Sequence, residues 1–366
     1  MIFSVLIVSI LLLQFAFLWI YIRFFSKNFR KEVHELPMVS ILVAARNEQS
    51  DLPRLLDSFA ELEYPQDKIQ FLFVDDNSQD ATALILENWC VTRENAKWVK
   101  LDAKDLFRKS PSPKANALAF LDEYAIGEYL FFTDADCQVP KSWIEEMWLS
   151  FEDQTGIVLG ITQVIGVDWL AYFQRMDWWF TLGLVKIASD FGLPTTGLGN
   201  NMAIRKDAYE ACGGFSAVSD SLTEDLEISR AIQQERYQIR FQLSPGTLVD
   251  TKAEADLSSL LSQRKRWMSG AMTLPWFWKA ALFLQILYFP ALIYILITVP
   301  ILGIVLAATK MVLQSQFLKR TGLKAGQSLS TVFTLLFDFY FLPLSVLTIL
   351  YYFWPSATEW KSRRYS

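Results

Sequence analysis

The stretch Tyr129-Leu-Phe-Phe-Thr-Asp-Ala-Asp136 gives the clearest indication of the fold class of this chain. Its first half is apolar and aromatic, as expected of a buried β-strand, and it leads directly into two carboxylates. Residues two apart on an extended chain point to the same side, so Asp134 and Asp136 share one face. Open α/β sheets bind ligands at the carboxyl ends of their strands. The stretch therefore predicts an α/β domain with a ligand site at the edge of its sheet.

The same texture continues on both sides of this stretch, from Leu36 to about Arg240. Short β-rich segments alternate with helical patterns, which is typical of βαβ units around a mainly parallel sheet. A dehydrogenase on a similar sheet is disfavoured because no G-x-G-x-x-G follows the first strand. Strands are expected at 39–45, 69–74, 98–101 and 129–133, and helices at 51–62, 80–88, 114–124 and 168–187.

An apolar segment precedes this domain. Residues 2–22 match the length that crosses a hydrocarbon core of roughly 30 Å as a helix. A cleaved signal peptide is disfavoured because no basic residue precedes the segment and no small-residue cleavage site follows it. Basic residues follow at positions 23, 27, 30 and 31, which places the next segment in the cytoplasm.

The C-terminal part of the chain is apolar again. Residues 282–308 contain Pro290 and Pro300 and form either one kinked span or a hairpin of two short spans, and residues 329–353 form another. Three or four spans are therefore expected. The aromatic-rich helix at 168–187 lies either near the bilayer surface or in the protein core. The expected domains are a transmembrane anchor with a basic linker at 1–35, a catalytic domain at 36–270, and a membrane region of two or three helices at 271–366.

The composition narrows the chemistry. Of the 366 residues, 52% are hydrophobic and 15% are aromatic, which is too apolar for an ordinary soluble enzyme. The net charge of -5 is spread along the chain, and no basic face is long enough to follow a nucleic acid. Three cysteines without paired metal spacing indicate a reducing compartment, and the single histidine, His34, excludes a zinc site of clustered histidines. Catalysis must therefore use carboxylates, a hard metal ion, or both.

Asp134 and Asp136 suit such a metal ion. Their oxygens would bind Mg²⁺ or Mn²⁺ and leave other coordination positions for the oxygens of a diphosphate. An isolated Asp-x-Asp is more often a solvated acidic turn, so neighbouring motifs decide. After the second strand comes Val74-Asp75-Asp76-Asn77-Ser78-Gln79-Asp80, whose acidic side chains can accept from a base N–H or a ribose hydroxyl, although turn and helix-cap chemistry favours the same residues. After the first strand, backbone and polar groups of Ala44-Ala45-Arg-Asn47-Glu48 would meet a nucleotide at the edge of the sheet; the alternative is a polar strand-to-helix loop.

A further acidic motif, Ser221-Leu-Thr-Glu224-Asp225, has the spacing of a capping box between Ser221 and Glu224 and predicts a helix N-terminus there. A carboxylate on the first turn of a helix is held rigidly. Asp225 is therefore a candidate for taking a proton from an acceptor hydroxyl. The alternative interpretation is that Asp225 only interacts favourably with the helix dipole.

Five residues from Gln263 to Trp267 precede the last apolar region. One interpretation is a juxtamembrane basic cluster attracted to anionic lipid. On a helix, however, Gln263, Arg266 and Trp267 share one face, which groups an amide, a guanidinium for phosphate and an aromatic platform. We therefore expect Arg266 to be specifically required, whereas Arg264 and Lys265 tolerate exchange for another basic residue.

Together these motifs resemble the inverting family 2 glycosyltransferases with a GT-A fold, in the membrane-integrated branch related to cellulose, hyaluronan and chitin synthases. The resemblance covers roughly residues 39–267. It implies a Rossmann-like, mainly parallel catalytic domain flanked by transmembrane helices. It also implies Mg²⁺ or Mn²⁺, a UDP- or GDP-linked sugar donor, and a lipid-linked or glycan acceptor beside membrane lipids. The motifs that carry it, in order, are Asp75-Asp76, Asp134-Ala-Asp136, Thr223-Glu224-Asp225 and Gln263-Arg-Lys-Arg266-Trp267.

The resemblance also implies roles for individual residues. Lys114, which opens a helix in Pro113-Lys-Ala-Asn-Ala-Leu, matches the family's lysine near the nucleotide. The implied roles are donor binding by Ala45, Asn47, Glu48, Asp75, Asp76, Lys114 and Asp134; metal binding by Asp134 and Asp136; catalysis by Asp225 with Glu224; and contacts with the acceptor or diphosphate by Asn200, Asn201, Gln263, Arg266 and Trp267.

The expected protein is an integral protein of the cell (inner) membrane with a cytoplasmic catalytic domain. The small number of spans after this domain favours transfer of a sugar to a lipid-linked or membrane-proximal acceptor over a short-chain processive polysaccharide synthase. Intact Asp136 and Asp225 argue against a membrane-bound scaffold that only binds a nucleotide-sugar. The sequence leaves the sugar and the acceptor open.

Overall fold

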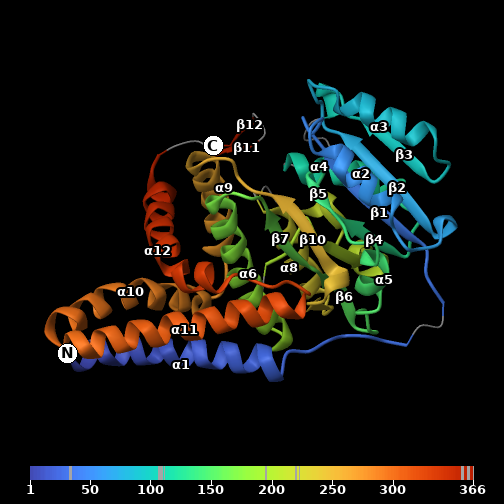
Figure 1. Cartoon of the computed structure of the whole chain (residues 1–366). Coiled ribbons are helices and arrows are strands. Elements are labelled where there is room, and N and C mark those ends of the chain that lie inside the picture. The colour runs from blue at the N-terminus through green and yellow to red at the C-terminus, as the bar shows by residue number, and fades with distance from the viewer. Residues whose placement is uncertain are drawn as a thin grey trace. The chain divides into compact units, whose positions relative to one another are not determined.

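The computed structural model describes residues 1–32, 35–105, 110, 112–193, 196–218, 221, 223–355, 358–360 and 363–365, so His34 lies outside the described residues. The chain divides into two compact units. Unit 1 comprises Met1–Lys27, Gly166–Pro194 and Glu254–Ser356, and unit 2 comprises Asn28–Ile165, Thr195–Ala253 and Ala357–Ser366. Figure 1 shows both units and labels most of their helices and strands.

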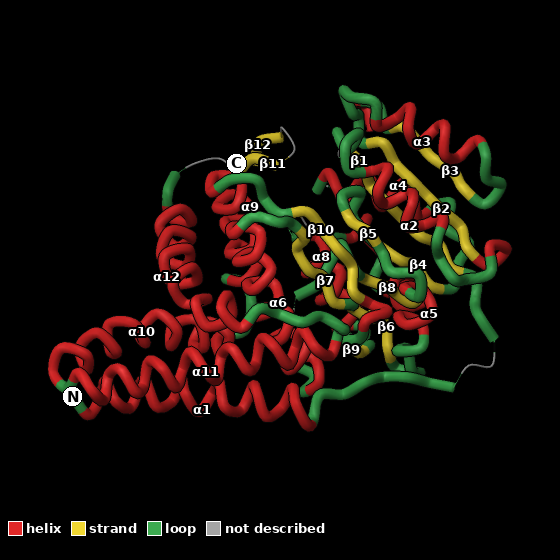
Figure 2. The backbone as a smooth tube through the Cα atoms, viewed as in Figure 1, coloured by secondary structure: helices red, strands yellow, loops and turns green. Residues whose placement is uncertain are grey.

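Unit 2 is built on a seven-stranded sheet in the order β3-β2-β1-β4-β8-β6-β9 (Figure 2). The neighbours β3, β2, β1 and β4 run parallel, β6 is parallel to β9, and β8 is antiparallel to both of its neighbours. The sheet is therefore mainly parallel, as predicted. Its strands are β1 (Val39–Ala45), β2 (Ile69–Asp75), β3 (Ala96–Lys100), β4 (Tyr129–Phe132), β6 (Thr155–Leu159), β8 (Met202–Arg205) and β9 (Gln238–Phe241).

A second sheet of three strands has the order β5-β10-β7. Its strands are β5 (Cys137–Gln138), β7 (Ile161–Ile165) and β10 (Leu248–Lys252). Because β5 directly follows the acidic turn after β4, and β10 pairs with it antiparallel, this small sheet brings Lys252 toward that turn. A short hairpin pairs β11 (Thr358–Trp360) with β12 (Arg363–Tyr365).

The helices of unit 2 follow the predicted βαβ pattern. In α2, the apolar residues Leu52, Leu55, Leu56 and Phe59 recur at helical spacing and are buried, and Phe59 packs on Phe71 of β2 with ring centroids 5.3 Å apart. Burial of this apolar face holds α2 against the sheet. The helices are α2 (Leu52–Ala60), α3 (Thr82–Val91), α4 (Pro113–Asp122), α5 (Trp143–Trp148), α7 (Lys206–Ala211) and α8 (Glu224–Gln234), with single 3-10 turns η1 (Gln66–Lys68), η2 (Ala103–Asp105), η3 (Gly214–Ala217) and η4 (Pro245–Thr247).

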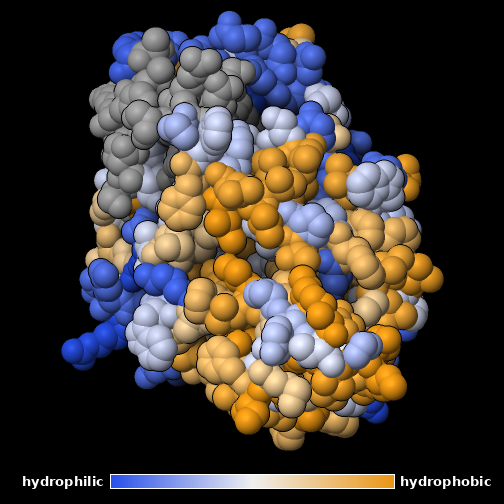
Figure 3. All heavy atoms as spheres, turned by 90° about the vertical axis from the view of Figure 1, so that its left-hand side faces the viewer, coloured by the Kyte–Doolittle hydropathy of each residue, from blue (hydrophilic) through white to orange (hydrophobic). Residues whose placement is uncertain are grey.

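Unit 1 contains four helices that are long and apolar enough to cross a membrane. Many of the large apolar side chains of these helices lie on the surface of the protein. Figure 3 shows apolar residues gathered over one face. In water such an exposed patch would be costly, so it indicates a hydrocarbon surrounding. The four helices are α1 (Ile2–Phe24), α10 (Trp276–Thr298), α11 (Pro300–Lys324) and α12 (Thr331–Phe353).

The segment at 282–308 resolves into two helices. The break lies at Val299, and Pro300 occupies the first turn of α11, where its missing N–H costs no helical hydrogen bond. Each helix is longer than the short spans expected of a hairpin, because α10 begins at Trp276 and α11 continues to Lys324. Pro290 lies inside α10 without ending it.

The other two helices of unit 1 are α6 (Trp169–Asp190) and α9 (Leu257–Ala271). Asp168 caps α6 by accepting the Ala171 N–H at 2.8 Å. The helix packs against α1, α11 and α12, and residues such as Met176 and Trp179 are fully buried, which favours the core interpretation of this segment. Thus two segments expected within the catalytic domain at 36–270 cluster with the apolar helices instead.

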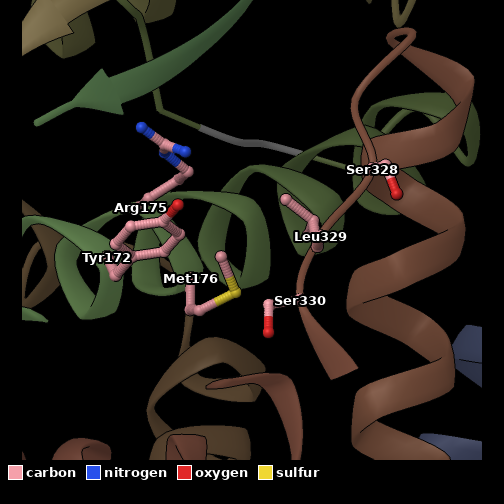
Figure 4. A pocket seen from close by; sticks show the side chains of 6 residues that line it. All are labelled: Tyr172, Arg175, Met176, Ser328, Leu329 and Ser330. Carbon is pink, nitrogen blue, oxygen red and sulfur yellow. The ribbon is translucent and has the colours of Figure 1, made fainter. Parts of the chain in front are cut away.

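Unit 1 also has a pocket of about 190 Å³ between α6 and the connection from α11 to α12 (Figure 4). Arg175 and Tyr172 form one wall, with the Arg175 guanidinium carbon 5.0 Å from the centre of the Tyr172 ring. The Tyr172 ring in turn stacks on Phe333 of α12 at 4.7 Å. These contacts tie α6 to the start of α12. The full lining is Tyr172, Arg175, Met176, Ser328, Leu329 and Ser330.

Candidate active site

Two loops at the carboxyl ends of β1 and β2 are fastened to each other. The Asp76 N–H donates a hydrogen bond to the Ala45 carbonyl at 2.9 Å. A second hydrogen bond runs from the Asn47 N–H to Ser78 Oγ at 3.0 Å. Asn47 and Asn77 have φ of 52° and 58°, in the left-handed region that asparagine tolerates better than most residues. Ala45, Asn47, Asp75 and Asp76 therefore come together, as the sequence predicts.

Asp75 has one carboxylate oxygen that is unpartnered among the described residues. Its side chain is fully buried, and its Oδ1 accepts the Ser78 N–H at 3.1 Å. Its Oδ2 is buried and has no hydrogen-bond partner among the described residues. A buried carboxylate oxygen without a donor is costly, so this atom fits a ligand that brings an N–H or O–H group.

The acidic turn after β4 begins with Asp134, whose carboxylate is bound by a lysine. Lys114, in the first turn of α4, places its Nζ 2.6 Å from Asp134 Oδ1 and 3.4 Å from Glu224 Oε1. Burial lowers the pKa of Lys114, but the charges of Asp134 and Glu224 outweigh burial and raise it above its usual value. Lys114 is therefore an ammonium at physiological pH, and it joins two motifs 90 residues apart in sequence (224 minus 134).

Asp225 lies beside this lysine on the first turn of α8. Its Oδ2 accepts the Gly199 N–H at 3.0 Å, and its Oδ1 accepts the Leu226 N–H at 2.9 Å. The loop that approaches it requires glycine: a Cβ at Gly197 would lie 2.1 Å from the Asp225 carbonyl oxygen. The carboxylate is thus held by backbone groups in a fixed direction, as a general base needs.

Asp136 lies in a different electrostatic setting. Its backbone carbonyl accepts from the Arg54 guanidinium, and its Oδ2 lies 4.0 Å from Lys252 Nζ. The pKa of Asp136 is raised to about 6, chiefly by burial and also by the charge of Asp134, while the charge of Lys252 acts in the opposite direction. Glu48, expected at the donor, is also buried here, with its Oε2 3.9 Å from the same lysine.

The chemistry of these residues fits a divalent metal ion that is shared with a ligand. Among the described residues, no group of three or more histidine, cysteine, aspartate or glutamate side chains can enclose a metal. Asp136 nevertheless offers hard carboxylate oxygens, and Mg²⁺-like ions are commonly bound by one or two carboxylates together with substrate phosphates. Asp134 would have to give up part of its contact with Lys114 to take part.

Asn200 and Asn201 are both buried, and their contacts differ. Asn200 Oδ1 accepts from Thr162 at 3.3 Å. The Asn201 amide is fully engaged, because it donates to the carbonyls of Ile161 and Thr247, each at 2.8 Å, and accepts from Trp143 at 2.9 Å. Asn201, which directly precedes β8, is therefore bound to β7, η4 and α5, a structural role that the sequence did not predict.

Gln263, Arg266 and Trp267 lie on α9 in unit 1. Gln263 donates to Glu254 at 2.8 Å, and Trp267 packs edge-to-face on Trp178 of α6 with ring centroids 5.3 Å apart. The basic residues between them have contacts of their own. Arg264 pairs with Asp177, and Lys265 donates to the Trp354 carbonyl at 2.9 Å. Both side chains thus have specific partners, and tolerance of Arg264→Lys and Lys265→Arg stays a prediction.

The helix N-terminus predicted at this motif is confirmed, but Ser221 does not cap it. Helix α8 begins at Glu224, and its N-cap, Thr223, makes no capping hydrogen bond through its side chain to the described residues. Ser221 lies two residues before this N-cap and accepts the Thr223 N–H at 3.1 Å. Sequence reasoning missed Gly197, Gly199 and Lys252. The Gly-x-Gly at 197–199 was a usable signal, whereas Lys252 had none, because only strand pairing brings it to Asp136.

Two family models match the chain. The model described as Glycosyl transferase family 2 matches residues 40–213, and the model described as Glycosyl transferase family group 2 matches residues 129–358. The second covers more than half of the chain. Together they include every predicted motif, from the loop after β1 to α9.

Curated relatives match over the same region. A beta-monoglucosyldiacylglycerol synthase from Nostoc sp. is 25% identical over 254 residues, which are 67% of this chain and 51% of that protein. A poly-beta-1,6-N-acetyl-D-glucosamine synthase from Staphylococcus epidermidis is 26% identical over 247 residues, 66% of this chain and 56% of that protein. The chain thus spans about half the length of the curated relatives it matches.

One solved structure aligns over almost the whole chain. The mannosyltransferase PcManGT from Pyrobaculum calidifontis, in complex with GDP-Man and Mn²⁺, has a TM-score of 0.59 and 16% identity, covering 95% of this chain and 98% of that chain. At this identity the likeness concerns the fold. It agrees with the mixed α/β architecture and confirms the predicted fold class.

Proposed function

This chain belongs to glycosyl transferase family 2, and from that premise we propose that it moves a sugar from a nucleotide-diphosphate sugar to a hydroxyl of a lipid-linked or membrane-proximal acceptor. The observation that carries the proposal is the contact of Lys114 with both Asp134 and Glu224, next to Asp225. Around the positive charge of Lys114 thus lie Asp134, proposed to bind the sugar donor, and Asp225, proposed as the base.

Asp225 is the proposed base. Its Oδ2, oriented by the Gly199 N–H, removes the proton from the acceptor hydroxyl. The hydroxyl oxygen then attacks the anomeric carbon from the side opposite the diphosphate, the bond to the diphosphate breaks, and the configuration inverts. The Lys114 ammonium contacts the carboxylates of Asp134 and Glu224 beside the base, and it limits the cost of gathering three carboxylates.

The donor is proposed to lie along the carboxyl ends of β1, β2 and β4. The orphaned Asp75 Oδ2 supports a nucleoside there, and Ala45, Asn47, Glu48 and Asp76 line the same loops. Asp134 and Asp136 would hold Mg²⁺ or Mn²⁺. That ion would supply Lewis-acid stabilisation to the departing diphosphate.

The remaining assignments rest on the family and on charge. Asn200, Gln263, Arg266 and Trp267 stay proposed contacts of the diphosphate or acceptor, with the Arg266 guanidinium suited to phosphate. The basic residues after α1 support a cytoplasmic catalytic unit at the cell (inner) membrane.

Two acceptor classes follow from the relatives. Similarity to a monoglucosyldiacylglycerol synthase supports a lipid acceptor, and similarity to a poly-N-acetylglucosamine synthase keeps a short-chain processive synthase as the second candidate. The products distinguish them, because a lipid transferase gives one discrete glycolipid, whereas a processive synthase gives a ladder of chain lengths.

The deciding experiment uses the full-length protein in lipid nanodiscs. It is incubated with a panel of UDP- and GDP-sugars and Mn²⁺, with and without diacylglycerol, and the released nucleoside diphosphate and the lipid products are measured. The expected result is acceptor-dependent release from one donor, absent in Asp225→Asn. Release that is equally fast in the Asp225→Asn protein would contradict the mechanism, and no release from any donor would contradict the proposed function.

A further inference from the structure

Lys252 carries a further inference because it contacts three carboxylates from three segments. Its Nζ lies 2.6 Å from Asp51 Oδ2, 3.9 Å from Glu48 Oε2 and 4.0 Å from Asp136 Oδ2. Glu48 follows β1, Asp51 is the N-cap of α2, and Asp136 is the second carboxylate after β4. Strand β10 thus contributes a cation to the edge of the proposed metal site.

The exposure of this group differs from that of Lys114. The Lys252 side chain is 47% exposed, whereas the Lys114 side chain is 15% exposed. A half-exposed ion pair on a flexible four-carbon stem exchanges partners at little cost. Lys252 can therefore leave its carboxylates when a stronger anion arrives, and Lys114 is held much more firmly.

We propose that Lys252 is a positioning residue that makes the metal ion and the sugar-nucleotide bind together. This rests on the proposed function, with the metal ion at Asp136. In the free protein, the ammonium offsets part of the negative charge of Asp136 and disfavours a lone divalent cation. When the cation arrives with a diphosphate, Lys252 turns from Asp51 to the phosphate oxygens and favours the complex.

The competing interpretation is a structural tether. The shortest contact of Lys252 is with Asp51, so the lysine would merely fasten the start of α2 to β10. The two interpretations differ in what Asp51→Asn does. If Lys252 only tethers α2, losing either partner has the same effect; if Lys252 controls the metal site, losing Asp51 releases the ammonium toward Asp136, the opposite of losing the lysine.

The test measures binding rather than turnover. Mn²⁺ alone is titrated into the full-length protein in nanodiscs and followed by electron paramagnetic resonance, and then UDP and GDP are titrated in saturating Mn²⁺ by calorimetry. For Lys252→Met we expect lone Mn²⁺ to bind on the order of tenfold more tightly and the nucleoside diphosphate on the order of tenfold more weakly. Asp51→Asn should weaken lone Mn²⁺ binding, and Lys252→Arg should keep the wild-type pattern.

The outcomes separate this inference from the proposed function. If Asp136→Asn leaves Mn²⁺ binding unchanged, the metal assignment itself fails. If Asp136→Asn abolishes Mn²⁺ binding but Lys252→Met changes neither affinity, only the inference about Lys252 is overturned. Equal effects of Lys252→Met and Asp51→Asn also overturn it, in favour of the tether. Thermal unfolding of each variant checks that the fold is intact.

Discussion

Both units bury charged side chains, but in different surroundings. In unit 2, Lys114 and Asp134 form a pair whose side chains stay 15% and 33% exposed, so a ligand can reach it. In unit 1, Lys186 and Asp190 are 1% and 0% exposed, and Arg264 and Asp177 are 13% and 4% exposed. A pair whose carboxylate is open to solvent at a strand end suits binding and chemistry, whereas a pair whose carboxylate is buried between packed helices suits structure.

Changes to the charged residues of the two units are therefore expected to alter different measured quantities. Changes in unit 2 should alter turnover or ligand affinity and leave stability nearly unchanged. Changes in unit 1 should alter stability first, because a buried charge that has lost its partner is strongly unfavourable.

The largest expected effect is removal of the metal ion. If Asp134 and Asp136 hold it, EDTA should abolish sugar transfer, and Mg²⁺ or Mn²⁺ should restore it. The unfolding temperature of the protein should change little, because burial of apolar residues holds the sheet of unit 2 together. Full transfer activity in chelator would remove the metal from the mechanism.

Replacing the proposed base should have the next largest effect. Asp225→Asn preserves the shape of the side chain and its bond from Gly199, but it cannot accept a proton. Turnover should fall by roughly 10²–10⁴-fold with nucleotide binding nearly intact. Steady-state kinetics and calorimetric titration of the nucleotide measure the two quantities. An unchanged turnover number would move the base elsewhere.

The Arg264–Asp177 pair of unit 1, whose carboxylate is buried, tests the expected effect on stability. Asp177→Ala leaves Arg264 buried without its partner and should lower the free energy of unfolding by about 3–5 kcal/mol. The double change Asp177→Leu with Arg264→Met should recover much of that loss. The control is Glu227→Ala in the more exposed Glu227–Arg230 pair, where about 0–1 kcal/mol is expected. Unfolding in micelles measures all of them, and equal losses at the two pairs would refute the contrast.

A smaller effect separates the residues of α9. Arg266→Lys should reduce turnover by about tenfold, because lysine cannot grip phosphate through two parallel hydrogen bonds. Lys265→Arg keeps the charge near the Trp354 carbonyl and should be close to neutral. Both variants should remain in the membrane fraction. Equal reductions would remove Arg266 from the proposed site.

The smallest effect is a pH dependence. Burial raises the pKa of Asp136 to about 6, so its carboxylate is mostly ionised at pH 7 and gains a proton as the pH falls below 6. Because a proton and a metal ion compete for the same oxygens, Mn²⁺ affinity should be nearly constant above pH 7 and fall by about tenfold per unit below pH 6. Titrations between pH 5 and pH 8 measure this. An affinity that rises on acidification would contradict the assignment.

Local patterns predicted most of the fold. Alternation of β-rich and helical segments gave the parallel strands β1 to β4, and apolar length gave the membrane helices. The pattern could not decide the place of α6, since its apolar and aromatic residues suit both a bilayer surface and a protein core. Only its packing against α1, α11 and α12 distinguishes these.

The candidate site shows the same division. Asp134, Asp136 and Asp225 were recognisable because each follows a strand or opens a helix. Lys252 was not, because it is 116 residues beyond Asp136 (252 minus 136) and reaches it through the pairing of β10 with β5. Asn201 had the converse problem: its position suggested ligand contact, whereas its side chain makes three hydrogen bonds within the protein, to β7, η4 and α5.

The way the chain alternates between the two units has a consequence for biogenesis. Each unit takes three separate segments of the chain, in alternation, so the polypeptide passes between them five times. A ribosome therefore delivers α1 long before its partners α10 and α11, and the catalytic sheet lacks β9 until after α6 has been made. Neither unit can be completed alone during synthesis. A soluble catalytic fragment cannot be obtained by trimming the ends; it would need a linker in place of 166–194.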